Sequence, residues 1–222
     1  MLRLSVRPHN KAREILLGEG IAEDRITVTG NTIVDAIYQN IQIARAQGNA
    51  LDTLHLIPKE YFLVTLHRQE NVDDRARFTS IMAGLNEVAA SFNLPVVYPI
   101  HPRSRKMMTE FGLAPGKLTL IDPLDFLGFI QVESNAGLIF TDSGGVQEEA
   151  CILNVPCVTL RENTERPETI DAGANVLAGT LPDRILQCTD LMLGRKNNWQ
   201  NPFGDGKAGE RIVRIITEGK IE

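Results

Sequence analysis

Three polar clusters in this sequence contain the residue types that bind anionic substrates. TLHRQEN (65–71), PIHPRSR (99–105) and TDSGGVQEEA (141–150) each overlap or follow the end of an apolar run. Histidine and arginine donate charge-assisted hydrogen bonds to phosphate, and a helix N-terminus presents unpaired N–H groups to an anion. If the apolar runs are parallel strands, their polar ends lie at one edge of a sheet. The clusters therefore predict one anion-binding site built from three parts of the chain.

The segment TDSGGVQEEA has the features of a phosphate site followed by a sugar site. Gly144 and Gly145 have no side chains to block an anion, and Ser143 offers a hydroxyl and its backbone N–H. Glu149 follows one helical turn into the next helix, where its carboxylate can accept two hydrogen bonds from a ribose diol. The same residues also fit an ordinary serine N-cap with two first-turn glutamates.

The string DSGG also occurs around the nucleophile of chymotrypsin-like proteases. In those enzymes the serine lies in an all-β barrel and needs His and Asp partners. The sequence around Ser143 alternates strand and helix patterns instead. This context disfavours a protease.

The cationic residues of the other clusters allow two interpretations. His67 and Arg68 end a strand candidate, where they can bind a diphosphate or simply face solvent. His101 precedes a proline turn with Arg103 nearby, and surface arginines need no function. Arg166, in RENTERPETIDAG (161–173), either reaches the same ligand or belongs to a solvated helix entrance.

Alternating strands and helices must position these clusters. The strand candidates are mostly continuous apolar runs, as expected for strands that are covered on both faces. They are 25–30, 61–67, 94–101, 117–122, 136–142 and 156–161. Helices are predicted at 31–47, 74–92, 103–112, 125–135, 145–153, 165–172, 181–193 and 207–218. This alternation predicts an α/β fold with a doubly wound parallel sheet.

Composition narrows the class of protein. The formal net charge of −5 and the pI of about 5.5 argue against nucleic acid as the main partner. Three cysteines without a CxxC pair predict neither a disulfide scaffold nor a metal site. The first residues lack the apolar core of a signal peptide, and no run is long enough to cross a membrane. We therefore expect a cytoplasmic protein.

Five motifs together resemble the non-hydrolysing UDP-N-acetylglucosamine 2-epimerase family. They are VTGNTIVDAI (28–37), TLHRQEN (65–71), IDPLDFLGF (121–129), TDSGGVQEEA (141–150) and TERPETIDAG (164–173). They occur in the family's order and approximate spacing. The resemblance implies a GT-B architecture, in which two Rossmann-like domains enclose the nucleotide sugar. It implies that residues 1–200, which include an N-terminal linker, form the second, UDP-binding domain. Residues 201–222 would form a terminal helix that returns toward the first domain.

The resemblance also implies roles for individual residues. Ser143, Gly144 and Gly145 would contact the diphosphate, and Glu149 would hold the ribose. The same comparison places Phe129 by the uracil, His67 as a catalytic residue at the phosphates, and Arg166 in the cleft. Arg68 and His101 match positions of an effector site, although HPRSRK around His101 differs from the Asn-Pro-containing version common in bacterial members.

The implied reaction inverts C2 of the sugar through elimination and re-addition of UDP, without a cofactor. The family's main catalytic carboxylates lie in the first domain, and no matching stretch occurs here. We therefore expect UDP-sugar binding, a partner Rossmann-like domain in the same or another chain, and a homodimer. Two alternatives remain: the donor-binding half of a GT-B glycosyltransferase, and a non-catalytic nucleotide-sugar sensor.

Overall fold

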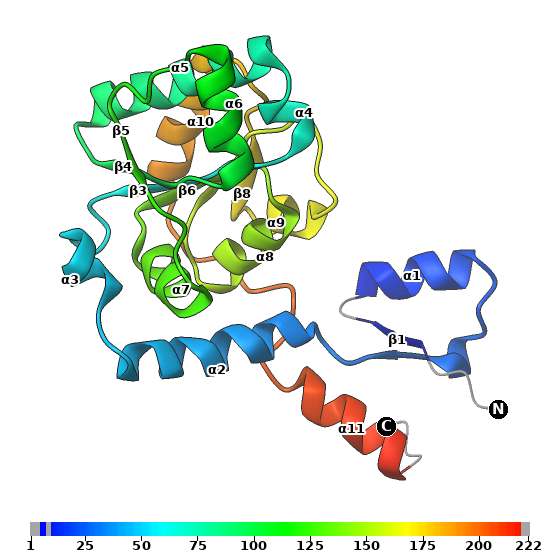
Figure 1. Ribbon diagram of the computed structural model, residues 1–222. Coiled ribbons are helices and arrows are strands. Elements are labelled where there is room, and N and C mark those ends of the chain that lie inside the picture. The colour runs from blue at the N-terminus through cyan, green and yellow to red at the C-terminus, as the bar shows by residue number, and fades with distance from the viewer. Residues whose placement is uncertain (1–4, 8–9, 219–222) are drawn as a thin grey trace.

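A six-stranded parallel sheet organises the chain (Figure 1). The computed structural model describes residues 5–7 and 10–218, and the side chains of residues 13–218. The sheet has the order β5-β4-β3-β6-β7-β8. Its strands are β3 (Phe62–Thr65), β4 (Val96–Pro99), β5 (Leu118–Ile121), β6 (Leu138–Thr141), β7 (Cys157–Thr159) and β8 (Asn175–Leu177). In chain order this is the 3-2-1-4-5-6 arrangement of a Rossmann fold, whose direction of winding reverses between β3 and β6.

Helices cover both faces of the sheet, so its strands are mainly apolar. One face packs against α4 (Gln69–Val72), α5 (Arg75–Phe92), α6 (Pro102–Phe111) and α10 (Pro182–Leu193). The other packs against α3 (Ala50–Leu54), α7 (Phe126–Asn135) and α8 (Gly144–Ile152), with α2 (Thr32–Ala46) lying outside α7 and α8. The short α9 (Pro167–Asp171) precedes β8. Burial on both faces explains why the strands do not alternate polar and apolar residues.

The helix pair α5 and α10 approaches closely at Gly84. A β-carbon at this position would lie 2.8 Å from Cδ1 of Ile185 and 3.0 Å from Cα of Pro182. The buried residues of α5 face the sheet at three- and four-residue spacing, as the sequence predicts. A larger side chain at residue 84 would therefore push α10 away from the core.

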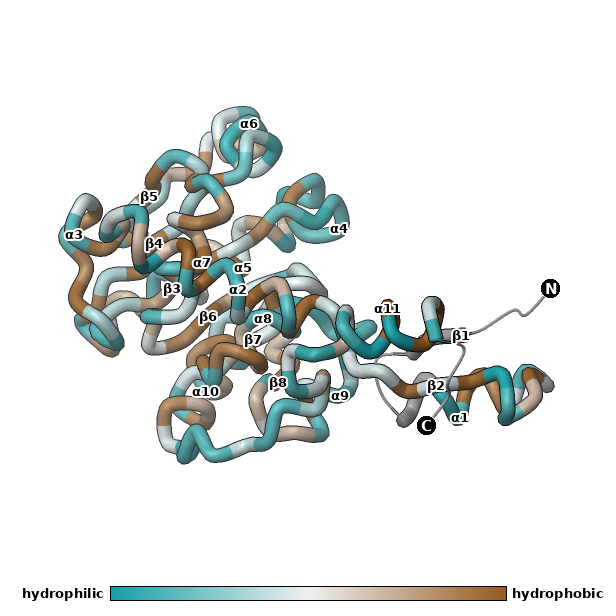
Figure 2. The backbone as a smooth tube through the Cα atoms, turned by 90° about the horizontal axis from the view of Figure 1, so that it is seen from below, coloured by the Kyte–Doolittle hydropathy of each residue, from teal (hydrophilic) through white to brown (hydrophobic). Residues whose placement is uncertain are grey.

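A second, smaller unit projects from the main body in both views (Figures 1 and 2). It contains β1 (Ser5–Arg7), α1 (Asn10–Gly18), a 3₁₀ turn (Glu23–Arg25) and β2 (Ile26–Val28). The strands β1 and β2 pair in parallel and form their own two-stranded sheet. The last helix, α11 (Ala208–Glu218), lies near this unit rather than on the main sheet.

Two segments of the chain, around Gly30 and around Gly204, pass next to each other between the main body and the projecting elements, and we call them the crossing segments. The backbone N–H of Asn31 donates to the carbonyl of Phe203 over 2.8 Å. Gly30 and Gly204 both have positive φ angles, of 90° and 116°, and a β-carbon on Gly204 would lie 3.2 Å from Cα of Gly30. Such close contact in the left-handed region favours glycine at both positions. The Asp35 carboxylate then caps α11 by accepting from its first N–H groups at 2.9 and 3.1 Å.

The structure confirms the predicted fold class and most of the predicted elements. The strand predicted at 25–30 exists as β2, but the expectation that it joins the main sheet is wrong because it pairs with β1. The sixth strand of the main sheet, β8, was not predicted. It is three residues long, and its Asn175 gives it a mixed polar composition. The short helices α1, α3 and α4 were also missed. Residues 219–222 of the predicted terminal helix lie outside the described residues.

Replacing Gly84 with alanine tests the helix contact. We expect Gly84→Ala to lower the free energy of unfolding by about 1–3 kcal/mol, because the new methyl group overpacks the α5–α10 interface. Urea denaturation monitored by circular dichroism measures the change. The control Ala83→Ser, on the exposed face of the same helix, is expected to change stability by less than about 0.5 kcal/mol. Equal stability of the two variants would contradict the packing argument.

Candidate nucleotide-binding site

The buried carboxylate of Asp142 joins the ends of β3 and β6. It accepts hydrogen bonds from the backbone N–H groups of His67 (3.1 Å) and Arg68 (2.9 Å), and from the side-chain amide of Asn71 (3.3 Å). Nδ1 of His67 lies 3.3 Å from the same carboxylate. Asp142 is fully buried, so these donors replace its water shell. The turn after β3 is thereby fixed against the start of the turn after β6.

A threonine pair at the last residues of β3 and β6 continues this connection. The hydroxyls of Thr65 and Thr141, which are register partners in the sheet, lie 2.6 Å apart. The Thr141 hydroxyl also accepts from the backbone N–H of Ser143 at 2.9 Å. This N–H was expected to be available to a ligand, and the structure shows instead that it is already bonded. The hydroxyl of Ser143 makes no capping bond to α8.

The first turn of α8 presents an open N-terminus. No hydrogen bond within the described chain occupies the N–H groups of Gly144 and Gly145. A β-carbon on Gly145 would meet nothing nearer than Oγ of Ser143, at 3.8 Å, so the space beside it is open. Gly144 is buried under the side chains of Glu165 and Arg166. The unpaired N–H groups and the helix dipole make this turn suited to an anion.

Histidine and arginine side chains lie at the same edge of the sheet. The rings of His67 and His101 have centroids 5.6 Å apart. Nδ1 of His101 accepts from the N–H of Arg103, so His101 caps α6. The exposed Arg68 makes no ion pair with any described residue, whereas Arg103 is bound to Asp73. His67 and Arg68 thus meet Ser143 through Asp142, and His101 joins them, as the three-cluster prediction requires.

The loop after β7 is held by ion pairs. Arg161, nearly fully buried, binds Glu70 through Nε at 2.6 Å and Glu165 through both terminal nitrogens at 2.8 and 3.0 Å. The guanidinium lowers the pKa of Glu165 to about 2. Arg166 lies against α8, with its Nε 2.7 Å from the carboxylate of Glu148. The loop therefore closes over one side of the glycine pair.

A buried polar network fixes that loop to α8 and β8. The side-chain oxygen of Gln147 accepts from Thr164 at 2.5 Å and from the amide of Asn175 at 3.2 Å. Asn175 also donates to Thr169 and accepts from Thr159. Because Gln147 and Asn175 are buried, each bond lost here would expose an unsatisfied polar group to the core. The network positions Arg166 through its neighbours.

The helices α7 and α8 carry the residues that are expected to contact the base and the ribose. Phe129 is half-buried and packs against the core between α7 and the sheet. Glu149 is half-buried on α8, one turn beyond Gly145. Burial raises the pKa of Glu149, and so does the neighbouring Glu148, whereas a bond to Glu133 lowers it. Glu133, on α7, is fully buried and was not singled out from the sequence.

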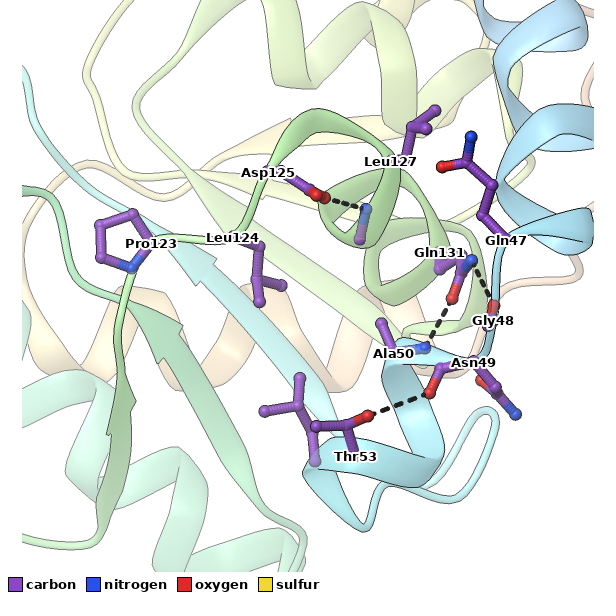
Figure 3. A pocket seen from close by; sticks show the side chains of 12 residues that line it. Gln47, Gly48, Asn49, Ala50, Thr53, Pro123, Leu124, Asp125, Leu127 and Gln131 are labelled. Carbon is purple, nitrogen blue, oxygen red and sulfur yellow. Dashed lines mark hydrogen bonds between the residues drawn. The ribbon is translucent and has the colours of Figure 1, made fainter.

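A separate hollow of about 400 Å³ lies between α3, α7 and the end of α2 (Figure 3). Gln131 bridges this region: its oxygen accepts from the N–H of Ala50 at 2.7 Å, and its amide donates to the carbonyl of Gly48 at 2.9 Å. None of the predicted ligand contacts lines the hollow. Its main feature is the attachment of the α2–α3 linker to α7.

The described part of the chain contains neither a metal-binding cluster nor a membrane-spanning helix. Among residues 5–7 and 10–218, no group of three or more His, Cys, Asp or Glu side chains is arranged to hold a metal ion. No helix in these same ranges combines the length and apolar character needed to cross a bilayer.

Sequence reasoning missed the residues that organise the site. Asp142, Asn71 and Arg161 are all buried polar groups whose bonds span different strands. Asp142 had a detectable signal, since an acid that ends a continuous apolar strand must find donors. Nothing local in the sequence indicated that Glu133 faces Glu149, because the two lie on different helices.

Fold and site together define a Rossmann-like nucleotide-binding protein. The glycine pair, the helix N-terminus and His67 lie where the sheet reverses its winding, which is where such folds bind nucleotides. A family model described as UDP-N-acetylglucosamine 2-epimerase matches residues 2–217. The chain belongs to this family, and its fold is the Rossmann-like half of a GT-B architecture.

Relatives and solved structures agree with this assignment. UDP-N-acetylglucosamine 2-epimerase of Methanocaldococcus jannaschii is 50% identical over 96% of this chain, and that of Methanococcus maripaludis is 47% identical over 94%. A crystal structure of the M. jannaschii enzyme in complex with UDP-GlcNAc and UDP superposes with a TM-score of 0.89 and 48% identity, over 98% of this chain. The chain spans about 60% of the length of these relatives and 61% of that crystallised chain.

Replacing Asp142 with asparagine tests its organising role. The new NH₂ group would face N–H donors, so we expect Asp142→Asn to lose about 1–3 kcal/mol of stability in urea denaturation. The loss follows from donors of the 67–71 turn that are left without an acceptor.

Asp125→Asn is the matched control, because Asp125 caps α7 and asparagine caps a helix equally well. A variant at residue 142 as stable as this control would contradict the assignment of Asp142 as the organising acceptor.

Proposed function

We propose that this chain is the UDP-binding part of a UDP-N-acetylglucosamine 2-epimerase, which interconverts UDP-GlcNAc and UDP-ManNAc. One observation carries the proposal: Ser143, Gly144 and Gly145 open a helix beside His67 at the switch point of the sheet. The M. jannaschii relative, crystallised with UDP-GlcNAc and UDP, gives the ligand class.

The diphosphate binds at the first turn of α8 in this proposal. The N–H groups of Gly144 and Gly145 and the hydroxyl of Ser143 donate to its oxygens. His67 directs Nδ1 toward Asp142, which leaves Nε2 for the phosphates near the reacting sugar. Arg166 lies beside the same diphosphate site.

The nucleoside extends along α8 toward α7. Glu149 accepts from the ribose hydroxyls, and Phe129 lies by the uracil, since an aromatic ring suits contact with a flat base. Gly145 and Glu149 are four residues apart on α8 and therefore share one helical face. Phosphate and ribose contacts thus follow one another at the spacing of a helical turn.

The chemistry assigned to these residues is stabilisation of the leaving group. Elimination breaks the bond between C1 and the UDP oxygen and removes the proton at C2, giving a 2-acetamidoglucal and UDP. Charge then develops on the diphosphate, where fixed N–H donors and His67 stabilise it. Re-addition of UDP after proton delivery to the opposite face gives the C2 epimer.

The proton transfers at C2 are assigned to the first Rossmann-like domain of the GT-B architecture, in the same chain or another. General acid–base catalysis of this kind contributes about 10²–10⁴-fold. We further infer a cytoplasmic homodimer, which analytical ultracentrifugation can test. Arg68 and His101 are proposed contacts for a second, effector UDP-sugar; both are exposed, Arg68 adjoins His67 in the sequence, and the ring of His101 lies 5.6 Å from that of His67.

Gly145→Val tests the diphosphate seat. We expect at least about a tenfold loss of UDP affinity in calorimetry, because the isopropyl group fills the space of the phosphate. Stability should change by less than about 0.5 kcal/mol, because no neighbour other than Oγ of Ser143 lies within 4 Å of the new β-carbon. Ala83→Val, on the exposed face of α5, is the control. Unchanged UDP binding by Gly145→Val would contradict the seat.

The activity itself is tested by supplying the first Rossmann-like domain. We expect UDP-GlcNAc alone to yield UDP-ManNAc, detected by NMR, when the chain is combined with a first domain. A glycosyltransferase half would instead need an acceptor, and a sensor would bind UDP-GlcNAc without forming product. Either of these results would overturn the epimerase proposal while leaving the nucleotide site intact.

A further inference from the structure

A pair of carboxyl groups lies behind the expected ribose contact. Glu133 of α7 is only 1% exposed, and its carboxyl group lies within hydrogen-bonding reach of that of Glu149 on α8. The Oε1 atom of Glu133 has no hydrogen-bond partner among the described residues. Two ionised carboxylates cannot share such a site, so a proton must lie between them.

The surroundings decide which carboxyl holds the proton. Glu133 is fully buried, whereas Glu149 is half-buried and reaches the surface. The charge of Glu148 on α8 acts on Glu149, and the Cys157 thiol of β7 lies within electrostatic reach of Glu133, and neither group brings positive charge. The helices packed against α7 carry Asp35 and Arg45 on α2 and Asp52 on α3, and Asp35 is already bonded to the first N–H groups of α11.

We propose that Glu133 is a positioning residue that keeps its proton at neutral pH and donates it in a hydrogen bond to the Glu149 carboxylate. The bond leaves Glu149 ionised and holds its other oxygen toward the ribose diol. Glu133 lies four residues after Phe129 on α7, so the same helical face carries the base contact and the donor behind the ribose contact. The inference rests on the proposed role of Glu149.

The direction of the pKa of Glu133 agrees with this arrangement. Burial raises it well above the ordinary 4.5, and the charge of Glu149 raises it further. When folding raises the pKa of a carboxyl group, the contribution of that group to stability is fully present below its pKa in the unfolded chain. The contribution is lost as the pH rises through its pKa in the folded protein. Glu133→Gln should therefore lose less stability than the wild type as the pH rises above about 4.5.

Infrared spectroscopy tests the proton directly, independently of any ligand. We expect the wild type at neutral pH to show the C=O stretch of a protonated carboxylic acid, which Glu133→Gln lacks and Glu149→Gln retains. Absence of the band in the wild type, or its persistence in Glu133→Gln, would overturn the proposal.

Ribose discrimination tests the positioning role. The ratio of affinities for UDP and 2′,3′-dideoxy-UDP reports the contact to the diol. Glu133→Gln keeps a donor of the same size, and we expect its ratio to remain within about twofold of the wild type. Glu133→Met keeps the approximate volume without a donor, and we expect the ratio to fall about tenfold, mainly through weaker UDP binding.

The variants Glu133→Gln and Glu133→Met distinguish a general structural defect from loss of the positioning role. A merely structural defect in Glu133→Met would weaken both nucleotides equally and leave the ratio unchanged, and this result would overturn the inference while the UDP site stands. If the wild type binds neither nucleotide at millimolar concentration, the proposed function fails, and the infrared result still decides where the proton lies.

Discussion

The site depends on one buried anion, the carboxylate of Asp142. Burying an isolated charge is prohibitively costly, so a charge at the end of β6 persists only where several donors converge on it. Here those donors come from the turn that follows β3, which is the neighbouring strand. The electrostatic requirement of Asp142 therefore fixes the distance between His67 and the N-terminus of α8. A phosphate site assembled from two separate turns needs such a constraint, since neither turn determines the other's position.

The distribution of charge around the glycine pair follows a consistent pattern. Arg161, Arg166 and Arg103 are each neutralised by carboxylates of the same chain. Positive potential at the open turn of α8 must therefore come mainly from the helix N-terminus and from Arg68, which forms no ion pair with any described residue. The paired arginines serve a different purpose. They hold the loop after β7 against Gly144, and the bidentate pair of Arg161 with Glu165 gives that loop a defined geometry.

Local patterns predicted the parts of this structure that depend on neighbouring residues in the sequence. Continuous apolar strands, helix stripes and the glycine pair predicted the sheet and the helix N-terminus at Gly144, because each of these signals extends over only a few residues. Long-range pairings left no such signal. The assignment of residues 25–30 to the main sheet was wrong because strand propensity does not indicate which strand is the pairing partner. In the structure β2 pairs with β1. The N–H of Ser143 was expected to bind a ligand. It donates to the Thr141 hydroxyl instead, and this bond depends on the side-chain rotamer of Thr141, which the sequence does not reveal. Glu133 escaped notice because an acid within an amphipathic helix resembles a solvent-exposed residue until α8 is placed over it.

The crossing segments and the proposed nucleotide site share a side chain, Glu148. Its carboxylate lies 2.7 Å from Nε of Arg166 and 3.5 Å from the amide of Asn31. Asn31 caps α2 and its backbone bonds to Phe203 on the second crossing segment. Gly30 and Gly204, which adjoin these residues, have the backbone freedom to change direction. Any rotation of the crossing about these glycines moves the Asn31 amide relative to Glu148. Because Glu148 also holds Arg166, the geometry of the crossing and the geometry of the proposed nucleotide site are mechanically connected through one carboxylate.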